Sequence, residues 1–309
     1  MKLRCVLTML AIVLGPALPS AADADGIMLV PAGAFWMGRD DGPPEQAPLH
    51  RVFVRDFWID RHKVTNAEFA QFLNAQGAVS PEGERRFDAD DEDARIHQAN
   101  VGPPPHPMYG QPVRWMADPG FERRPAVEVT WFGARDYCRW KGRRLPTEAE
   151  WEKAARGDDK RPYPWGFAPP SPERAVYGRR YNATEPADAR PAGRSPYGVE
   201  DMLGNLREWT STILRPYPYR HDDGREGLTG EGRGVRSRRA DAEPQAERAR
   251  GEPVRVGAPV SVVVRGASHD DPAGELSVTL RRSYDRRGAA AGHHHVGFRC
   301  ATSEDLGGR

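Results

Sequence analysis

The residues best suited to chemistry gather late in the chain, in the stretch RGASHDDPAGEL over residues 265–276. His269 is followed directly by Asp270 and Asp271, and Glu275 comes shortly afterwards. A histidine beside carboxylates can act as a general acid or base, or bind iron or copper through nitrogen and oxygen ligands. The alternative is a polar turn in which Asp270 or Asp271 accepts hydrogen bonds from the backbone amides of DPAG. The sequence alone allows both interpretations.

A second set of candidate metal ligands is the run His293, His294 and His295. Adjacent side chains of a strand point to opposite faces, so on a strand only His293 and His295 would share a face and bind one metal ion. A surface loop beside the last strand is the alternative interpretation. A metal site gains support only if His269 lies close to His293 or His295 in space.

The first 24 residues are predicted to be a secretory signal peptide. Lys2 and Arg4 precede an apolar run over residues 6–18, and the small-residue triplet ADA follows at residues 22–24. The apolar run is too short for a membrane anchor, and no later segment is long and apolar enough to be one. The mature protein is therefore expected in the periplasm or secreted.

Only two of the three cysteines, Cys138 and Cys300, would remain after removal of residues 1–24, because Cys5 leaves with the signal. An even pair in an oxidising compartment favours a disulfide. The alternative is two free thiols or a redox pair, which the absence of a CxxC spacing does not support.

Composition limits the class of protein. The 309 residues include 32 glycines, 29 prolines and 8 tryptophans, which indicates a globular chain with much irregular backbone. A net charge of +1 gives no reason to expect nucleic acid or an acidic membrane surface as a partner. Residues 25–305 are predicted to form one domain and to act as a monomer.

Capping signals predict three helices that would position these residues. Thr65 with Glu68, and Thr147 with Glu150, form capping boxes, and Thr130 is a third N-cap. Glycines follow each helix, at positions 77, 142 and 157. Strands are predicted in MLVPAGAFWMG, HRVFVRDFWID, APVSVVVRGAS and HVGFRCAT. Residues 80–121 are predicted as a long loop, and residues 215–258, which mix charges with few large apolar side chains, as a mobile surface insertion.

Seven segments in order resemble one family: VPAGAFWMG, HRVFVRDFWIDRHKVTNAEFAQF, PAVEVTWFGARDYCRWKGRRLPTEAEWEKAARG, YPWG, DMLGNLREWTS, VVRGAS and GFRC. Together they resemble the formylglycine-generating enzyme, or sulfatase-modifying factor, family. That family includes the C-terminal domain of ergothioneine-type sulfoxide synthases and the pyoverdine-maturation oxidases. The resemblance implies an α+β, C-type-lectin-like fold with a small twisted antiparallel sheet. It also implies that Cys138 is bonded to Cys300.

The resemblance further implies a calcium site in DMLGNLRE. Asp201 and Glu208 would supply side-chain oxygens, and Gly204 and Leu206 would supply backbone carbonyls, a mixed set that Ca²⁺ accepts. In the alternative, Glu208 only accepts hydrogen bonds from amides of the turn. Trp209, in the EWT element, is implied to line the cleft, although core packing is an equal alternative.

The copper chemistry of the family is predicted to be absent. Its two copper-binding cysteines align with Asp271 and Leu276, and neither residue is a soft thiolate ligand for Cu(I). Arg265 and Arg282 could bind a ligand's carboxylate or phosphate, but arginines beside strands more often pair with the protein's own acids.

Two functions follow from these observations. The first is an exported, calcium-stabilised, lectin-like module that binds a protein, a peptide or a small molecule and assists the maturation of a partner. The second is a metal-dependent oxidase of a non-sulfatase substrate, with iron or copper held by histidines and carboxylates. The candidate catalytic residues are His269, Asp270, Asp271, Glu275 and Trp209.

Overall fold

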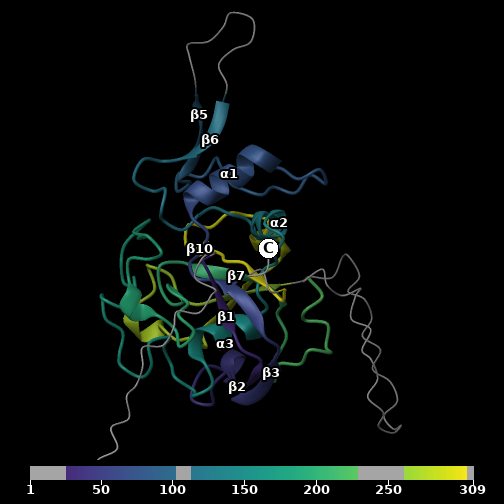
Figure 1. The fold of residues 1–309 in the computed structure, drawn as a ribbon, viewed down its shortest axis with the longest axis vertical. Helices are drawn as coiled ribbons and strands as arrows, with labels where there is room; N and C mark the ends of the chain where they lie inside the picture. The colour runs from purple at the N-terminus through teal and green to yellow at the C-terminus, as the bar shows by residue number, and fades with distance from the viewer. Residues whose placement is uncertain (1–25, 102–112, 229–260, 305–309) are drawn as a thin grey trace, which may run out of the picture.

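The computed structural model describes residues 26–101, 113–228 and 261–304. The predicted signal peptide and the later part of the predicted insertion, residues 229–258, lie outside these ranges. Within them, α1 and the hairpin of β5 and β6 lie at one end of the molecule, and α3, β2 and β3 lie at the other (Figure 1). In the described ranges, no helix has the length and apolar character needed to cross a membrane.

The described residues contain short strands, a few helices and long irregular connections. The strands are β1 (Ile27–Val30), β2 (Gly33–Met37), β3 (His50–Val54), β4 (Phe57–Asp60), β5 (Ile96–Asn100), β6 (Val113–Ala117), β7 (Arg207–Ile213), β8 (Val262–Arg265), β9 (Arg281–Tyr284), β10 (Val296–Gly297) and β11 (Ala301–Thr302). The α-helices are α1 (Asn66–Gln76), α2 (Trp131–Trp140), α3 (Glu148–Arg156) and α4 (Arg286–Ala289).

The strands form small, mostly antiparallel sheets. In one sheet the order is β1-β4-β11, and in the other larger sheet it is β10-β7-β8-β9. The strand pairs β2–β3 and β5–β6 complete the set among the described residues. The pairing of β10 with β7 is parallel, whereas the other pairs are antiparallel. This architecture confirms the predicted α+β fold with small antiparallel sheets.

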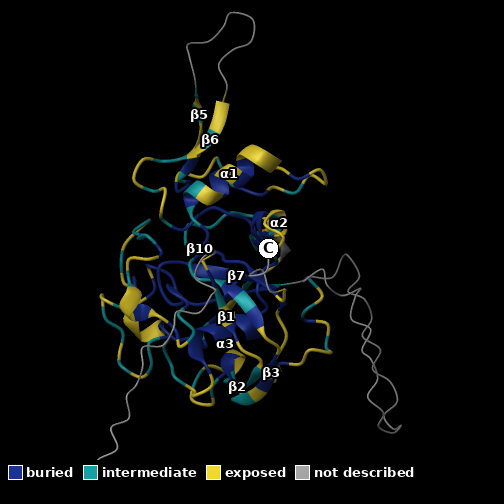
Figure 2. Cartoon of the chain, viewed as in Figure 1, coloured by how far each residue is buried: buried dark blue, intermediate teal, exposed yellow. Residues whose placement is uncertain are grey.

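The three capped helices are confirmed at their predicted starts. Thr65 and Thr147 each accept a hydrogen bond from the backbone of the third helical residue, and the capping box is complete in both α1 and α3. Thr130 accepts a hydrogen bond from the backbone of Gly133 at the start of α2. α3 is buried along its whole length, and its acidic residues are therefore paired inside the protein (Figure 2).

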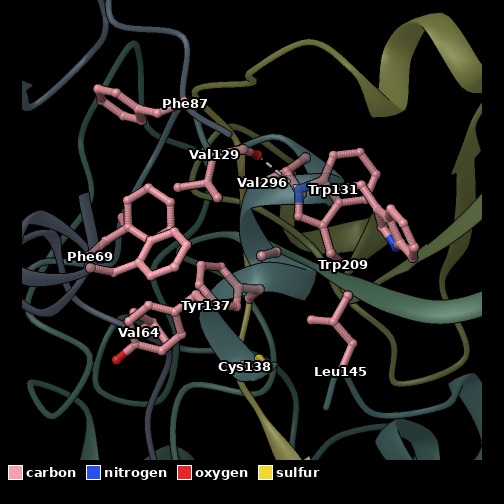
Figure 3. Packing of buried hydrophobic residues seen from close by; sticks show 14 of the residues in the cluster. Val64, Phe69, Phe87, Val129, Trp131, Tyr137, Cys138, Leu145, Trp209 and Val296 are labelled. Atoms are coloured by element: carbon pink, nitrogen blue, oxygen red, sulfur yellow. Dashed lines mark hydrogen bonds between the residues drawn. The ribbon is translucent and has the colours of Figure 1, made fainter. Parts of the chain in front are cut away.

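The largest apolar cluster lies between α1, α2 and the sheet of β7. Phe69 and Phe72 of α1 pack against Tyr137 of α2, with ring centroids 5.9 and 5.7 Å from that tyrosine. Trp209 of β7 lies on the far side of this cluster from Phe69, and its indole donates a 3.0 Å hydrogen bond to the carbonyl of Val129 (Figure 3). Through Trp209, this apolar cluster contacts Tyr284 and His293, which lie next to the candidate site residues.

Two predictions about irregular segments are wrong. The predicted loop over residues 80–121 contains the antiparallel pair β5–β6, whose weak alternation of side chains gave no strand signal. The described part of the predicted insertion, residues 215–228, packs on the protein, because Tyr219 and Arg225 are buried. Tyr219 joins an apolar cluster of the core, and Arg225 pairs with Asp223 at 2.6 Å, so this charged segment is held by both apolar contacts and an ion pair.

The disulfide between Cys138 and Cys300 is present, and it joins α2 to the residue before β11. The two cysteines are 162 residues apart in the sequence. A crosslink over so long a loop restricts the unfolded chain strongly.

We expect the double variant Cys138→Ala/Cys300→Ala to lose about 5 kcal/mol of unfolding free energy, because the unfolded chain regains the entropy of an open loop. Urea unfolding followed by tryptophan fluorescence measures this loss. The wild-type protein reduced with dithiothreitol is the matched control and should unfold at a similar midpoint. Equal midpoints for oxidised and reduced wild type would show that the disulfide contributes nothing.

Candidate functional site

The histidine run lies in a turn that leads into β10, and the parallel pairing of β10 with β7 determines its place. The backbone amide of Arg207, the first residue of β7, donates to the carbonyl of His295 at 3.0 Å. Just before β7, the carbonyl of Asn205 accepts from the backbone amide of His269 at 2.8 Å. The start of β7 therefore holds both histidine-bearing segments, which are distant in sequence, next to each other.

Asp270, His294 and His295 form a group that is able to bind a metal ion. Each offers one ligand atom, and these atoms all lie within 4.8 Å of one another. His294 Nε2 and His295 Nδ1 are 3.4 Å apart. Two nitrogen ligands at right angles on one metal ion, each about 2.1 Å from it, would be separated by about 3 Å. The observed distance of 3.4 Å is slightly longer than this separation.

The outer nitrogens of both imidazoles have partners that orient the rings. His294 Nδ1 faces a carboxylate oxygen of Asp93 at 3.4 Å, and His295 Nε2 forms a 2.6 Å hydrogen bond with the hydroxyl of Tyr284. Protons on these outer nitrogens would leave two lone pairs facing each other between the rings. A carboxylate behind a ligating histidine is a common arrangement in metal sites, where it fixes the tautomer and the orientation of the ring.

His269 lies beside this group, fully buried, with its ring centroid 6.2 Å from that of His294. Its Nδ1 is 3.0 Å from the carbonyl oxygen of Asn205, which can only accept, so Nδ1 carries the proton. Within the described residues, Nε2 of His269 has no hydrogen-bond partner. This is a neutral imidazole with a free lone pair beside two others.

The electrostatics of the site favour neutral imidazoles and an ionised carboxylate. Burial, followed by the nearby charge of Arg207, lowers the pKa of His295 to about 3. Burial also lowers the pKa of His269 and of His293. Burial alone would raise the pKa of Asp270, but the Ser268 hydroxyl and Arg207 hold it below its usual value. These are the protonation states that metal binding requires.

A second group, Asp93, Glu128 and His294, shares one histidine with the first. Burial, together with the neighbouring Asp91, Asp88 and Asp93, raises the pKa of Glu128 to about 8. Glu128 therefore holds a proton at neutral pH, which a metal ion would first have to displace. For this reason Asp93 is better placed as the orienting partner of His294 than as a ligand.

The prediction that only His293 and His295 could share a metal ion assumed a strand and is corrected by the structure, in which His293 lies in irregular backbone and residues 294 and 295 form a turn. The alternation that excluded His294 does not apply to a turn. His293 instead stacks on Tyr284, with ring centroids 4.2 Å apart, and its Nε2 is 2.9 Å from the carbonyl of Gly288. The ring centroids of His293 and His295 are 5.7 Å apart, but the group with ligand atoms close together is formed by His294, His295 and Asp270.

Asp271 has a structural role, although it adjoins the site. It pairs with the buried Arg207 at 2.5 Å and accepts a 2.8 Å hydrogen bond from the amide of Ser268. Asp271 therefore stabilises a polar turn, which was the alternative to a reactive site. The amide that it accepts from belongs to Ser268, before it in the sequence, and not to the DPAG segment. Glu275 is exposed and pairs with Arg282 at 2.5 Å. Leu276 is buried in a small apolar cluster with Leu203 and Ala267.

Trp209 is fully buried, so it packs in the core and contacts the site only from below. Its ring centroid is 5.3 Å from that of Tyr284 and 6.0 Å from that of His293. Arg265 is likewise buried and pairs with Glu148 and Glu152 of α3, so it is not available to a ligand.

The predicted calcium ligands lie around an ammonium group. Lys63 Nζ is 2.9 Å from a carboxylate oxygen of Asp201, 3.4 Å from the carbonyl of Gly204 and 3.6 Å from a carboxylate oxygen of Glu208. Glu208 also pairs with Arg299 at 2.7 Å. Leu206, the fourth predicted ligand, is buried. As they stand, these residues do not fit a calcium ion, because a lysine already occupies the space between them.

The sequence analysis missed Asp93, Tyr284 and Lys63. Asp93 and Tyr284 come from segments far from the histidines in sequence, so no local spacing connects them with the site. Lys63 follows Arg61 and His62 in the same link between a strand and a capping box, and nothing in this local pattern indicated which of the three side chains is buried.

Three comparisons relate the chain to known proteins. The family described as "Sulfatase-modifying factor enzyme 1-like domain" matches residues 16–304. A hercynine oxygenase of Mycolicibacterium smegmatis is 37% identical over 221 residues, which cover 66% of this chain and 50% of that protein. A formylglycine-generating enzyme of Mycobacterium tuberculosis is 37% identical over 224 residues, which cover 61% of this chain and 74% of that protein. The chain thus spans half the length of the hercynine oxygenase.

Among solved structures, PvdO from Pseudomonas aeruginosa is similar, with a TM-score of 0.55 and 23% identity. The superposition covers 89% of this chain and 93% of PvdO. At this identity the likeness shows the fold, which agrees with the C-type-lectin-like architecture expected from the sequence.

We expect Asp271→Ala to lower the unfolding free energy by about 3 kcal/mol, because it leaves the buried guanidinium of Arg207 unpaired. Thermal and urea unfolding measure the loss. Glu275→Ala is the matched control: it also removes a carboxylate paired with arginine, but an exposed one, and should cost less than about 1 kcal/mol. Equal losses for the two variants would contradict the structural role of Asp271.

Proposed function

Since the chain belongs to the sulfatase-modifying factor enzyme 1-like family, we propose that it is an oxidase-type member that uses a histidine and carboxylate metal site in place of copper thiolates. The observation that carries the proposal is the meeting of Asp270, His294 and His295 within 4.8 Å. Two imidazoles with one carboxylate are the donor set of non-heme iron oxygenases, and copper also accepts imidazole ligands.

The proposal excludes the copper chemistry of true formylglycine-generating enzymes for this chain. Both cysteines that remain beyond residue 25 are joined in a disulfide. The two positions that align with copper ligands hold Asp271, paired with Arg207, and Leu276, packed among apolar side chains. Neither position offers a thiolate, so any metal would have to be bound by the neighbouring histidines.

Residues of the chain around the site would orient the two imidazole ligands and contact a substrate. Asp93 would keep the proton of His294 on the outer nitrogen, and Tyr284 would do the same for His295. The ring of Tyr181, which is 67% exposed and stacks on His294 at 5.7 Å, would offer a face to a substrate at the mouth of the site. An iron or copper ion would supply one-electron chemistry with dioxygen as the oxidant.

A periplasmic or secreted location is part of the proposal. The basic and apolar pattern of residues 1–24 supports it, and so does the disulfide, because disulfides persist in oxidising compartments.

We expect protein stripped with a chelator and then loaded anaerobically with Fe²⁺, or with Cu²⁺, to retain one metal ion per chain. His294→Ala and His295→Ala should lose this ion, because each removes one of the three ligands. Asp93→Asn should weaken binding by about 10- to 100-fold through the orientation of His294. Inductively coupled plasma mass spectrometry of desalted protein gives the stoichiometry, and titration gives the affinity.

The matched control is His97→Ala, which removes an exposed histidine that also pairs with a carboxylate, Asp118 at 2.7 Å, on the β5–β6 hairpin. It should leave metal retention unchanged. If His294→Ala and His97→Ala retained metal equally, or if neither metal bound to the wild type, the site would not be a metal site. That result would favour the lectin-like accessory module as the function.

A further inference from the structure

Lys63, in the link between β4 and α1, places a positive charge inside the protein, against residues 201–204 of the loop that precedes β7. Its side chain is completely buried. Its Nζ donates to the carboxylate of Asp201 at 2.9 Å and to the carbonyl of Gly204 at 3.4 Å, and also to the carbonyl of Asp201. Glu208 Oε1 lies 3.6 Å away. Within the described residues, these hydrogen-bond and ion-pair partners of the ammonium are oxygen atoms of three residues.

These oxygens belong to three of the four residues that the family resemblance assigns to calcium. A calcium ion binds through several carboxylate and carbonyl oxygens arranged around one point. An ammonium group needs the same kind of oxygens but is compact and carries only three protons to donate. Lys63 Nζ occupies the common centre of Asp201, Gly204 and Glu208, so a calcium ion and this side chain exclude each other.

The charge of the loop is balanced without a metal ion. Arg299 is fully buried and binds Glu208 through two hydrogen bonds, of 2.7 and 3.0 Å. It also donates to the carbonyl of Glu200 at 2.9 Å. Two buried carboxylates, Asp201 and Glu208, therefore face two buried cations. A calcium ion would add two uncompensated positive charges to a site without solvent, which is strongly unfavourable.

The backbone that follows Lys63 is held by hydrogen bonds to other segments. The amide of Val64 donates to the carbonyl of Phe298 at 3.0 Å, and the amide of Ala126 donates to the carbonyl of Val64 at 2.8 Å. The capping box of α1 begins at Thr65. The position of Lys63 is therefore determined on its C-terminal side by three backbone interactions.

From these contacts we infer that Lys63 is the resident cation of this loop, a tethered ammonium that replaces the family's calcium ion and makes the fold independent of calcium. The consequence extends to the histidines. Asp201 accepts a 2.9 Å hydrogen bond from the side-chain amide of Asn205, and the backbone carbonyl of Asn205 accepts from the backbone amide and the ring Nδ1 of His269. Lys63 is thus a positioning residue for this side of the candidate site. The inference concerns the loop and does not require that the histidines bind metal.

The test compares thermal unfolding in excess EGTA with unfolding in excess CaCl₂. The wild type should unfold at the same temperature in both. Lys63→Ala should unfold at a lower temperature in EGTA, because Asp201 and Glu208 lose a buried counter-charge, and CaCl₂ should raise its Tm by about 5 °C, because the ion can now enter. Lys63→Met is the matched control: it also removes the charge but fills the space, so calcium should not restore its stability.

A wild-type Tm that falls in EGTA, or one calcium ion per chain in purified wild type, would overturn the inference. So would an identical response of Lys63→Ala and Lys63→Met to calcium. If Lys63→Ala is insoluble when expressed, refolding it from urea with CaCl₂ or with EGTA gives the same comparison, and equal yields would contradict the inference.

Discussion

The buried carboxylate of Glu208 is the constraint on which the rest of the structure depends. A carboxylate without solvent requires compensating charge, and two distant segments supply it: Lys63 from the link between β4 and α1, and Arg299 from the residues before β11. Side chains of β7 alternate between faces, so the neighbours of Glu208 point the other way. Arg207 reaches Asp271 there, and Trp209 supports Tyr284 and His293 from below. On one face of β7, Glu208 is neutralised by Lys63 and Arg299. On the other face, Arg207 and Trp209 contact residues at the candidate site.

The replacement of the family's copper ligands and the presence of the histidine group are connected through the same short turn. Asp271 uses its carboxylate to hold Arg207 and the amide of Ser268, which fixes the backbone on either side of His269 and Asp270. Asp270 then points toward His294 and His295. Asp271, which aligns with a copper-binding cysteine of the family, therefore positions Asp270, the carboxylate of the proposed metal site. Under the proposed function, the ligands of the cleft would be nitrogen and oxygen atoms instead of thiolates.

The sequence pointed to the segments that meet at the candidate site and to two members of its ligand group, Asp270 and His295, but not to His294. His269, Asp270 and the histidine run lie together, as a metal site requires, and His295 is a member of the group. His294 was excluded because a strand was assumed, and the turn at residues 294 and 295 removes that reason. Asp93 and Tyr284, which orient the two imidazoles, come from separate segments. A local pattern cannot identify partners that are brought near only by the pairing of β10 with β7.

The sequence by itself determined the features that depend on neighbouring residues: the capped helices α1, α2 and α3, the glycines that follow them, the family, and the even number of cysteines available for a disulfide. Capping and helix termination act over a few residues, so their signals are local. The tertiary structure decided which buried charges meet. The sequence around Asp201 and Glu208 does not reveal whether a calcium ion or an ammonium group lies between them. Only the folded chain brings Lys63 to that point. Electrostatic partners act through space, so their identity is a property of the fold.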